Sequence, residues 1–404
     1  MAHSKCLIVS THHRPLVGGA LTVYEALAKH SAGRISILTA FYDYTTGQEV
    51  PGWQAYDAAA PYKITRIRHM RANLLSAYAG ITQKIVRKIG VFFNNRRILN
   101  QTLSLIKKNE ISTVCIGAQD ALGWLVKPLK KHTSVKVVIY VHGEEVSQPA
   151  FSPKFETRRQ QGLLAADAVV AVSRFTVNLL VENYRVPIER IKLHTNGVDL
   201  QVFGGTDLAP ANADIDLPAQ PWVFGCGRLM ERKGFDQLIE AWPAVIEAFS
   251  TAKLVIGGEG PLSDQLKKQI LRLGLESSVS LRGWIPDSDL PYYYQQAALF
   301  AMPNRTLPDG DTEGFGLVFL EAAAMGTPSI AGLGGGTADA VTEGETGLFV
   351  DGANIQHISD AIVRLLEDEP LRQKMGAQAI AHAKTQGWQK KTDDLVSFFS
   401  ALHA

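Results

Sequence analysis

Two glutamates, Glu313 and Glu321, lie eight positions apart on either side of a turn sequence that leads into an apolar segment. Gly314, Phe315 and Gly316 would form the turn, and a helix would start directly after them. Glu321 would then lie at most roughly 12 Å along the helix axis from Glu313, because each helical residue adds ~1.5 Å. One carboxylate would reach a hexose and the other a ribose, while backbone N–H groups of the turn and helix start bind the diphosphate between them. The spacing therefore predicts a nucleotide-sugar site, although two solvated charges at a helix start would show the same pattern.

Two cations, Arg228 and Lys233, lie five positions apart just beyond a predicted strand that begins at Trp222. When the bond between a sugar and a phosphate breaks, negative charge builds up on phosphate oxygens, and fixed cations stabilise it most where water is excluded. Arginine binds phosphate through two parallel hydrogen bonds, whereas lysine acts as a point charge. We therefore predict that both bind a diphosphate leaving group, with solvated cations at a helix start as the alternative. Arg232 is interpreted as a solvated side chain.

Metal and cofactor chemistry have little support in this sequence. The three cysteines, Cys6, Cys115 and Cys226, are scattered through strand-like apolar runs without the paired spacing of a metal site, so we expect buried free thiols. Asp309 and Asp311 have the spacing of a metal-binding pair, but Asp-Gly-Asp before a helix is more typical of a turn and a helix cap. We therefore predict that the protein uses no metal and no cofactor.

The segment around the two glutamates resembles the retaining glycosyltransferases of family 4, which have the GT-B fold. The resemblance rests on the E-x7-E spacing, on Arg305, on Asp-Gly-Asp at 309–311 and on Gly-Thr-Pro-Ser-Ile-Ala-Gly at 326–332. It covers nearly the whole chain and is strongest at 224–351. Three further runs, at 116–120, 141–146 and 304–306, are most similar to bacterial phosphatidylinositol mannosyltransferase-type members, which use GDP-mannose. A basic segment and the sequence at 307–311 depart from those members.

The resemblance implies transfer of a hexose, with mannose from GDP-mannose as the first expectation, to a hydroxyl group of a lipid-linked or envelope glycan acceptor. UDP-glucose and UDP-N-acetylglucosamine remain open as alternative donors. Family members use front-face attack, in which the leaving phosphate accepts the proton of the acceptor. Two other classes are disfavoured: a non-catalytic nucleotide-sugar-binding scaffold, because glutamates, cations and glycines occur together, and an NAD-dependent oxidoreductase, because neither half has a full G-x-G-x-x-G after its first strand.

The resemblance also implies roles for individual residues. Glu313 would position the hexose and Glu321 the ribose, while Arg228 and Lys233 would hold the diphosphate. His142 follows a predicted strand at 137–141 and would contact the donor sugar from the opposite domain. The implied catalytic residues are therefore His142, Arg228, Lys233 and Glu313.

Further donor contacts are implied for backbone groups. Ile285 aligns with a position whose backbone meets the nucleotide base in relatives, and Gly18 with Gly19 would let the backbone approach the phosphates. Glu144 and Glu145 are interpreted as surface charges rather than acceptor ligands. The complete expected donor-binding set is Gly18, Gly19, Arg228, Lys233, Ile285, Glu313, Gly314, Phe315, Gly316 and Glu321.

At 404 residues the chain exceeds the size that a single hydrophobic core usually supports, so two domains are expected. Continuous Val and Ile runs alternate with helical stretches in both halves, which predicts parallel sheets covered on both faces. The expected fold class is α/β: two Rossmann-like doubly wound domains that face an interdomain cleft, which is the GT-B fold. The first, acceptor-side domain is expected at 1–205 with a returning C-terminal helix at 386–404, and the second, nucleotide-sugar-binding domain at 206–385. Ligands should bind where the strands of both sheets end.

The formal net charge of +2 hides an asymmetry, because residues 63–108 contain eleven Lys or Arg and no Asp or Glu. Apolar residues recur there with the period of one helical face: Leu74, Tyr78, Ile81, Ile85, Ile89 and Phe92. Cations fall largely between them: Lys84, Arg87, Lys88, Arg96 and Arg97. We predict reversible docking on an anionic membrane surface. The alternative is a core-facing helix with a solvated basic face, and nucleic acid is not an expected partner because no binding motif accompanies the charge.

The amino-terminal sequence up to Ser10 contains only a short apolar run at 6–9. That run is too brief for a signal peptide or a membrane span. The chain is therefore expected in the cytoplasm, peripheral on the cytosolic face of the membrane.

Overall fold

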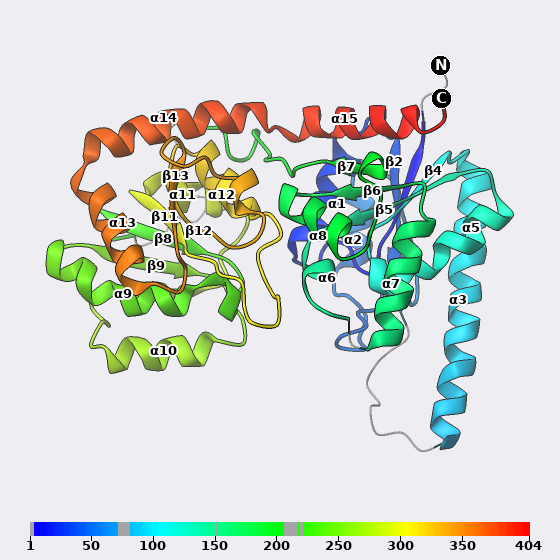
Figure 1. Cartoon of the computed structure of the whole chain (residues 1–404), viewed down its shortest axis with the longest axis horizontal. Coiled ribbons are helices and arrows are strands. Elements are labelled where there is room, and N and C mark those ends of the chain that lie inside the picture. The colour runs from blue at the N-terminus through cyan, green and yellow to red at the C-terminus, as the bar shows by residue number, and fades with distance from the viewer. Residues whose placement is uncertain (1–3, 72–80, 151, 206–216, 219–220) are drawn as a thin grey trace. The chain divides into compact units, whose positions relative to one another are not determined.

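The structure, a computed structural model, describes the 404-residue chain except for residues 1–3, 72–80, 151, 206–216 and 219–220, and for 81–87 it describes the backbone alone. The chain divides into two compact units (Figure 1). The first unit comprises Met1–Val172, Val177–His194 and Trp388–Ala404, and the second unit comprises Ser173–Thr176 and Thr195–Gly387. The segment that begins at Thr195 thus belongs to the second unit, where Val198 N donates to Gln386 O at 3.0 Å.

The described part of the first unit holds a seven-stranded parallel sheet in the order β3-β2-β1-β4-β5-β6-β7. Its strands are β1 (Cys6–Val9), β2 (Ile35–Ala40), β3 (Ile64–Ile67), β4 (Thr113–Ile116), β5 (Lys136–Val141), β6 (Ala168–Ala171) and β7 (Ile191–Leu193). The chain runs outward in one direction from β1 to β3 and returns beside β1 as β4. This reversal makes the sheet doubly wound, with β1 and β4 at the switch point.

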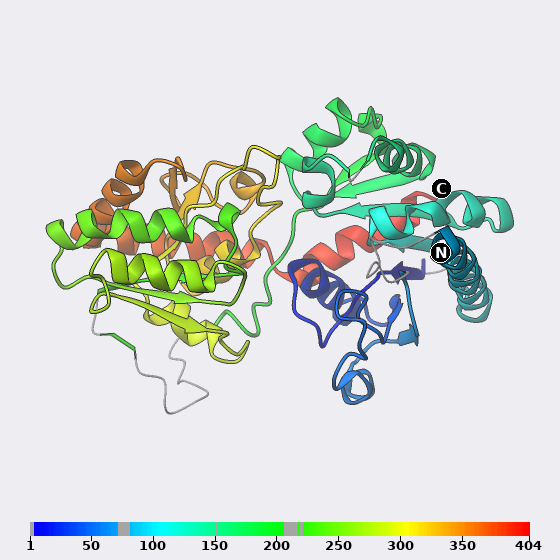
Figure 2. The ribbon, with the colours of Figure 1, turned by 90° about the horizontal axis from the view of Figure 1, so that it is seen from below.

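The connections of the first unit are mostly helical, and helices lie on both sides of the strands (Figure 2). They are α1 (Gly19–Lys29), α2 (Trp53–Ala59), α3 (Ile81–Asn109), α4 (Gln119–Leu122), α5 (Val126–His132), α6 (Glu144–Ser147), α7 (Pro153–Ala165) and α8 (Arg174–Glu182), the last starting in the second unit. The C-terminal helix α15 (Trp388–Ala401) packs against α1. It is fixed by its buried Trp388 and Leu395 and by an ion pair of 2.8 Å from Asp393 to Arg34.

The second unit has its own parallel sheet, six-stranded in the described residues, in the order β10-β9-β8-β11-β12-β13. Its strands are β8 (Trp222–Cys226), β9 (Lys253–Gly257), β10 (Val279–Gly283), β11 (Leu299–Met302), β12 (Ser329–Gly332) and β13 (Gly347–Val350). Its helices are α9 (Phe235–Ala248), α10 (Ser263–Arg272), α11 (Leu290–Gln296), α12 (Leu317–Ala324), α13 (Ile355–Glu367) and α14 (Glu369–Thr385). The predicted pair of Rossmann-like, doubly wound sheets is therefore confirmed.

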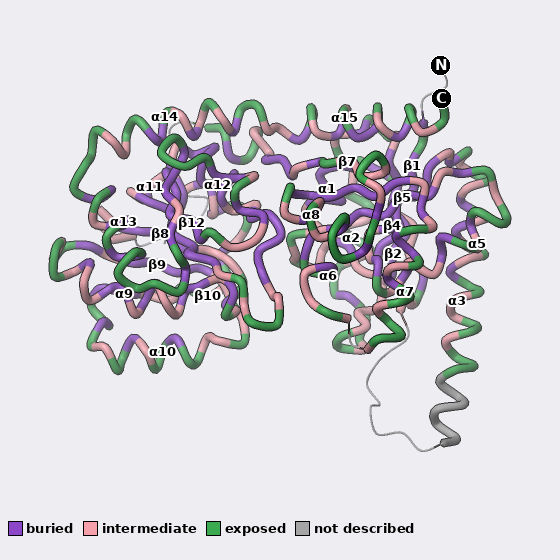
Figure 3. Tube along the Cα trace, viewed as in Figure 1, coloured by how far each residue is buried: buried purple, intermediate pink, exposed green. Residues whose placement is uncertain are grey.

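The strands of both sheets form the buried interior of their units (Figure 3). The aromatic side chains Trp222, Phe224, Tyr294 and Phe300 are fully buried around β8 and β11. Burial of such large rings contributes most of the favourable free energy of folding in this layer. The sheets are thereby rigid supports for the loops at their carboxyl ends.

Helix α3 carries the described part of the predicted basic face. Ile98 is buried in the core, but Ile89, Phe92 and Phe93 are 52%, 61% and 63% exposed, so a core-facing face at these positions is excluded. The exposed cations of this helix include Lys88, Arg96 and Arg97. Leu74, Tyr78 and the side chains at 81–87, with Lys84 and Arg87 among them, lie outside the described residues. Among the helices of the described residues, none is long and apolar enough to cross a membrane.

Candidate active site

The loop after β8 brings Lys233 into contact with Glu313, although 80 positions separate them in the sequence. Lys233 lies in a single 3-10 turn (Glu231–Lys233), which Gly234 joins to α9, and its Nζ donates to Glu313 Oε2 at 2.5 Å. Both side chains are little exposed, at 13% and 11%. Burial alone would raise the pKa of Glu313, but the charge of Lys233, its hydrogen bond and the charge of Arg232 outweigh burial and lower that pKa. Glu313 is therefore ionised at neutral pH and acts as a hydrogen-bond acceptor.

Arg232 is buried, so the prediction of a solvated side chain was wrong. Its Nη1 lies 3.3 Å from both carboxylate oxygens of Asp311, and a buried cation requires such a partner. The 3-10 turn directs Arg232 toward the loop that precedes α12. Asp311 was correctly placed in a turn, since its N–H donates to Asp309 Oδ1 at 3.0 Å. It does not cap the helix, because the N-cap of α12 is Gly316.

Arg228 differs from its two neighbours in the same loop. Its side chain is exposed and forms no hydrogen bond or ion pair with any residue that the structure describes. The Arg228 carbonyl accepts from Met230 N at 2.8 Å, which tightens the loop. The structure thus holds the Arg228 backbone in place and leaves its cationic charge without a carboxylate partner among the described residues.

Helix α12 begins where the sequence predicted. Gly316 has a φ of +89°, which other residues rarely adopt, and the helix starts at Leu317. Glu321 lies on this helix and accepts from the Tyr294 hydroxyl group at 2.9 Å. Tyr294 is fully buried, and burial together with the charge of Glu321 raises its pKa well above the ordinary value. Tyr294 therefore keeps its proton and fixes the orientation of the Glu321 carboxylate.

A second glycine loop, at 334–336, packs against the turn before α12 and is not among the predicted site residues. Gly336 N donates to Glu313 O at 2.8 Å, and a Cβ at this position would lie 2.0 Å from Gly314 O. Only glycine permits this approach, which holds Glu313, Gly314 and the buried Phe315 in one arrangement. The run of three glycines after β12 was the available signal.

Two residues of the loop after β11 hold in place the loop that carries Arg232 and Lys233. Arg305, one of the residues that carry the family resemblance, donates to both carboxylate oxygens of Asp236 at 2.9 and 2.8 Å. Its backbone N–H donates to Arg232 O at 2.8 Å. Asn304, which was not singled out, is fully buried and bridges this loop to Gly332 and Gly334 through its amide group. These contacts fix the position from which Lys233 reaches Glu313.

Ile285 follows β10 and is buried at 6% exposure. Its side chain fills the space beside Gly257, where an added Cβ would lie 2.4 Å from the Ile285 Cδ1 atom. The side chain is therefore a packing element, and the predicted donor contact concerns its backbone. That contact stays a prediction.

In the first unit, His142 follows β5 and belongs to a fixed aromatic group. Its Nε2 lies 2.6 Å from the Tyr24 hydroxyl oxygen, and the hydroxyl group itself donates to Gly117 O at 2.7 Å. Tyr24 has one proton, so His142 Nε2 must carry the proton of their shared hydrogen bond. Burial lowers the pKa of His142 to about 3, so the ring is neutral at physiological pH and its Nδ1 is an acceptor. The ring also stacks on Tyr140 at 5.0 Å.

Gly18 and Gly19 stand at the start of α1. Gly18 has an extended backbone (φ 169°), which any residue adopts, and it is the N-cap of α1. An added Cβ at Gly18 would make an ordinary contact of 3.6 Å with Leu21, and at Gly19 it would meet nothing within 4 Å. The fold of the chain itself therefore does not require glycine at either position. Their predicted approach to phosphates stays a prediction.

The two glutamates that follow His142 differ in how far they are exposed. Glu144 is exposed, whereas Glu145 is half-buried and accepts from His142 N at 2.8 Å. Burial raises the pKa of Glu145 to about 7, with smaller contributions from the charges of Glu144 and Asp120 and opposing backbone hydrogen bonds. The interpretation as a surface charge therefore holds for Glu144 and was wrong for Glu145.

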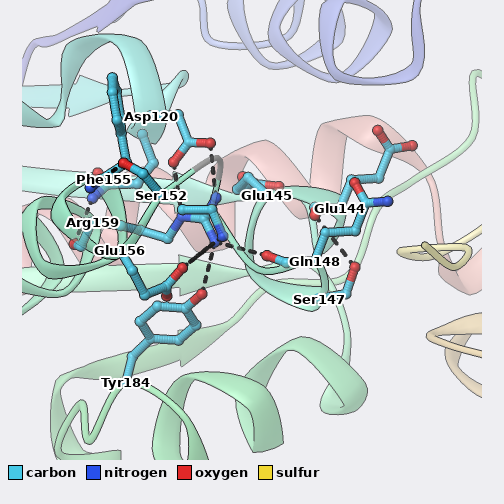
Figure 4. A network of polar contacts seen from close by, with 12 residues as sticks. Asp120, Glu144, Glu145, Ser147, Gln148, Ser152, Phe155, Glu156, Arg159 and Tyr184 are labelled. Carbon is cyan, nitrogen blue, oxygen red and sulfur yellow. Dashed lines mark hydrogen bonds and ion pairs between the residues drawn. The ribbon is translucent and has the colours of Figure 1, made fainter. Parts of the chain in front are cut away.

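Beside this pair, Arg159 fixes the loop that follows α6 (Figure 4). Its guanidinium group donates to both oxygens of Asp120 at 2.8 and 2.9 Å, to Gln148 O at 2.9 Å and to the Tyr184 hydroxyl oxygen at 2.8 Å. The residue is 5% exposed, and its charge is fully partnered. Arg159 was missed because its partners are distant in the sequence, and we assign it a structural role.

Within the described residues, no group of three or more His, Cys, Asp or Glu side chains has the arrangement of a metal site. The second unit instead brings together cations and carboxylates at the loops that follow β8, β11 and β12. The unit is thus an α/β fold with a cluster of charged side chains at the carboxyl ends of its strands, where such folds bind their ligands.

Comparison with known proteins identifies the family. The chain matches Glycosyltransferase Family 4 over residues 17–202 and Glycosyl transferases group 1 over residues 217–382. It is 34% identical over 276 residues to the GDP-mannose-dependent alpha-(1-6)-phosphatidylinositol monomannoside mannosyltransferase of Mycobacterium tuberculosis, covering 68% of this chain and 71% of that protein. It is 30% identical to the D-inositol 3-phosphate glycosyltransferase of Corynebacterium glutamicum, covering 69% of each.

Solved structures show the same fold. A crystal structure of HepE from Anabaena, in complex with UDP and glucose, has a TM-score of 0.74 at 20% identity, covering 98% of this chain and 100% of that one. Sucrose-phosphate synthase from Thermosynechococcus elongatus has a TM-score of 0.73 at 21% identity, covering 99% of both. The chain belongs to glycosyltransferase family 4, has the GT-B fold and is an enzyme of that family, as the resemblance predicted.

Proposed function

We propose that this enzyme is a retaining hexosyltransferase that transfers mannose from GDP-mannose to a hydroxyl group of a lipid-linked or envelope glycan acceptor. The observation that carries the proposal is the contact between Lys233 and Glu313 in the second unit, beside the start of α12 and Arg228. The relatives of 34% identity whose names specify GDP-mannose and phosphatidylinositol mannosides support the choice of donor and acceptor.

In this proposal the second unit holds the donor. The ionised Glu313 accepts hydrogen bonds from hexose hydroxyl groups, and Glu321, oriented by Tyr294, accepts from the ribose. Arg228 and Lys233 stabilise the negative charge that develops on the diphosphate, and backbone N–H groups at the start of α12 bind its oxygens. Ile285 contributes a backbone contact to the base. The leaving phosphate accepts the proton of the acceptor, so the chain supplies no general base.

For the first unit, the proposal gives His142 a hydrogen bond to the donor sugar. A neutral ring with Nε2 protonated offers Nδ1 as an acceptor for a sugar hydroxyl group. Gly18 and Gly19 leave room for phosphate oxygens near the start of α1. We assign the catalytic roles to His142, Arg228, Lys233 and Glu313.

A donor screen by thermal unfolding tests the proposal. The purified chain is heated with GDP-mannose, UDP-glucose, UDP-N-acetylglucosamine or NAD. A ligand at 100 times its dissociation constant stabilises the folded state by ~2.7 kcal/mol, so the true donor raises the melting temperature visibly. We expect the largest shift with GDP-mannose. A larger shift with a UDP-sugar would replace the donor, and a shift with NAD alone would refute the transferase site.

We further propose that the reaction needs no metal, because Arg228, Lys233 and the start of α12 provide the positive charge that a divalent cation supplies in other transferases. Turnover of the purified enzyme should be unchanged in excess EDTA. Loss of activity that magnesium restores would contradict this part of the proposal.

Docking on the cytosolic face of an anionic membrane completes the proposal. Exposed Ile89, Phe92 and Phe93 would enter the lipid interface, and each nearby cation of α3 contributes ~1 kcal/mol at an anionic surface. Binding to phosphatidylinositol vesicles should weaken as salt rises, because exposed charges are screened within ~8 Å at physiological ionic strength.

Two sets of variants separate the contributions to docking. Replacing Lys84, Arg87, Lys88, Arg96 and Arg97 by Gln should remove the salt dependence and leave donor affinity intact. Replacing Phe92 and Phe93 by Ser should weaken binding at all salt concentrations. The exposed Lys267 and Lys268 of α10, replaced by Gln, are the matched control. A wild type that ignores acidic vesicles at low salt would refute docking and leave the transferase assignment standing.

A further inference from the structure

The loop after β3 of the first unit carries two arginines that the proposed donor site does not use, and each lies against a tyrosine of the loop after β2. The Arg68 guanidinium lies 5.1 Å from the ring centroid of Tyr42, and that of Arg71 lies 4.9 Å from the ring centroid of Tyr44. With the residues that the structure describes, neither guanidinium forms an ion pair or a hydrogen bond. The absence of Asp and Glu from residues 63–108 means that no neighbour in sequence neutralises them.

Arg66, on β3 itself, shows what a structural arginine in this region looks like. Its side chain is 1% exposed and donates to both oxygens of Asp57 at 2.8 and 2.9 Å, to Ala40 O at 3.1 Å and to Arg14 O at 2.5 Å. Its hydrogen-bonding capacity is used within the protein. Arg68 is exposed and Arg71 half-buried, and their donors are not used in this way.

The aromatic rings hold these two arginines in position without occupying their donors. An aromatic ring contacts the face of a guanidinium group. The N–H groups of the guanidinium lie in its own plane, so they remain available for an anion. Tyr44 is itself fixed, because His12 stacks on it at 4.4 Å with an interplanar angle of 3°. The nearby carboxylate of Asp43 bonds to His12 at 3.0 Å and to Thr45, and among the described residues no ion pair joins it to Arg71.

We propose that Arg68 and Arg71 form an anion-binding subsite for the acceptor, and that the acceptor carries a phosphate group on a polyol or sugar. This inference rests on the proposed function, which makes the first unit the acceptor side. Phosphate oxygens accept two parallel hydrogen bonds from a guanidinium group, and arginine is favoured over lysine where such planar recognition is needed. The phosphate can belong to a soluble phosphorylated polyol or to a lipid headgroup.

The test measures binding of inositol 1-phosphate to the full chain, saturated with GDP or UDP, whichever stabilises it, so that the donor site is filled. Replacing Arg68 and Arg71 together by Gln should raise the dissociation constant at least tenfold. Neutral inositol should bind wild type far more weakly, and its affinity should not change in the variant. The matched control is Arg158→Gln on α7, where an exposed guanidinium lies 5.7 Å from the Phe155 ring. The Lys double variant, which keeps charge but loses the planar fork, should bind with intermediate affinity.

A second arm replaces the soluble probe by vesicles of phosphatidylinositol or phosphatidylcholine. If the double variant loses binding of the soluble phosphate, the site recognises the headgroup alone. If the double variant loses binding only to phosphatidylinositol vesicles, the phosphate belongs to a lipid. Equal binding of both probes by the double variant and wild type would overturn the subsite. Failure of every nucleoside diphosphate sugar to stabilise the chain would instead refute the proposed function, and the two results are read from separate measurements. Unchanged nucleotide binding and circular dichroism show that the variants are folded.

Discussion

The loops after β8, β11 and β12 of the second unit differ in charge from the loop after β5 of the first unit. In the second unit, three cations face carboxylates: Lys233 with Glu313, Arg232 with Asp311 and Arg305 with Asp236. In the first unit, the group around His142 is neutral, with the imidazole ring hydrogen-bonded to Tyr24.

This difference indicates which kind of ligand group each region is suited to bind. Paired charges that hold a lysine and an arginine in fixed positions form a preorganised environment for a group whose charge increases during a reaction. A neutral histidine in a fixed tautomer suits recognition of a hydroxyl group, since it offers one acceptor without a net charge. Four predictions probe this comparison.

The largest effect is expected for Lys233→Ala in the charged region. Removing one preorganised donor of this kind typically lowers kcat by roughly 10²- to 10³-fold, and we expect that range at saturating donor. The control is Lys267→Ala on α10, where the lysine pairs with Asp264 at 3.6 Å and is 65% exposed. That variant should remain within about twofold of wild type, because exposed pairs contribute little.

A kcat of Lys233→Ala near the wild-type value, in a folded protein, would show that this cation holds Glu313 in place and does not act on the leaving group. Circular dichroism and the unfolding temperature separate this outcome from loss of structure, since the variant leaves Glu313 buried without its partner.

The second-largest expected effect is a loss of donor affinity when Glu321 is replaced. Glu321→Ala should weaken donor affinity by roughly 10- to 100-fold, the range of ~1.5–3 kcal/mol for a hydrogen bond to a charged group. Calorimetric titration with the donor measures it. Glu321→Gln keeps an acceptor for the buried Tyr294 hydroxyl group, so its loss of affinity reports ribose recognition without the cost of an unpaired hydroxyl. Donor affinity of both variants equal to wild type would remove Glu321 from the site.

The sequence predicts those features whose residues lie close together along the chain. The two sheets, the turn before α12 and the cations after β8 follow from local patterns, since Val and Ile runs, glycines and short spacings define them. The contact of Lys233 with Glu313 and the burial of Arg232 depend on how a 3-10 turn directs side chains toward a loop 80 residues away. No local pattern encodes that direction, so Arg232 was wrongly interpreted as solvated.

The same limit applied in the first unit. His142 was found because it follows a strand, but its fixed tautomer depends on Tyr24 and Gly117, which come from other elements. A sequence shows charge and not burial, so it predicts a surface charge at Glu145, which the structure half-buries.

The third prediction tests the neutral region. His142→Phe should lower kcat/KM by about fivefold, because a neutral hydrogen bond contributes ~0.5–1.5 kcal/mol. Since burial holds the pKa of His142 at about 3, the wild-type pH profile should show no limb from this residue between pH 5 and pH 9. Tyr24→Phe keeps the packing but frees the tautomer, so its effect should be smaller. A wild-type limb near pH 6.5 that vanishes in His142→Phe would show that the ring is charged in the working enzyme.

The smallest expected effect is a change in the unfolding free energy that depends on the protonation of Glu145, beside His142. Its pKa in the folded protein, about 7, lies above the ordinary value of 4.5, chiefly because burial disfavours the charged form. The folded state therefore favours the protonated carboxyl group, so this contribution to the unfolding free energy is fully present below about pH 4.5 and is lost as pH rises to about 7. Glu145→Gln mimics the protonated form and keeps an acceptor for His142 N.

The variant should therefore gain stability relative to wild type across that window, by about 1 kcal/mol after allowance for screening of a half-buried group. Urea unfolding at pH 4.5, 6 and 7.5 measures this gain. Glu144→Gln, one position earlier and exposed, should show a much smaller trend, because it acts only by removing a charge that helps to raise the pKa of Glu145. If both variants differ from wild type by the same amount at every pH, the Glu145 carboxyl group titrates normally. The first unit would then carry a fixed negative charge next to His142, and the contrast between a neutral and a charged region would fail at this position.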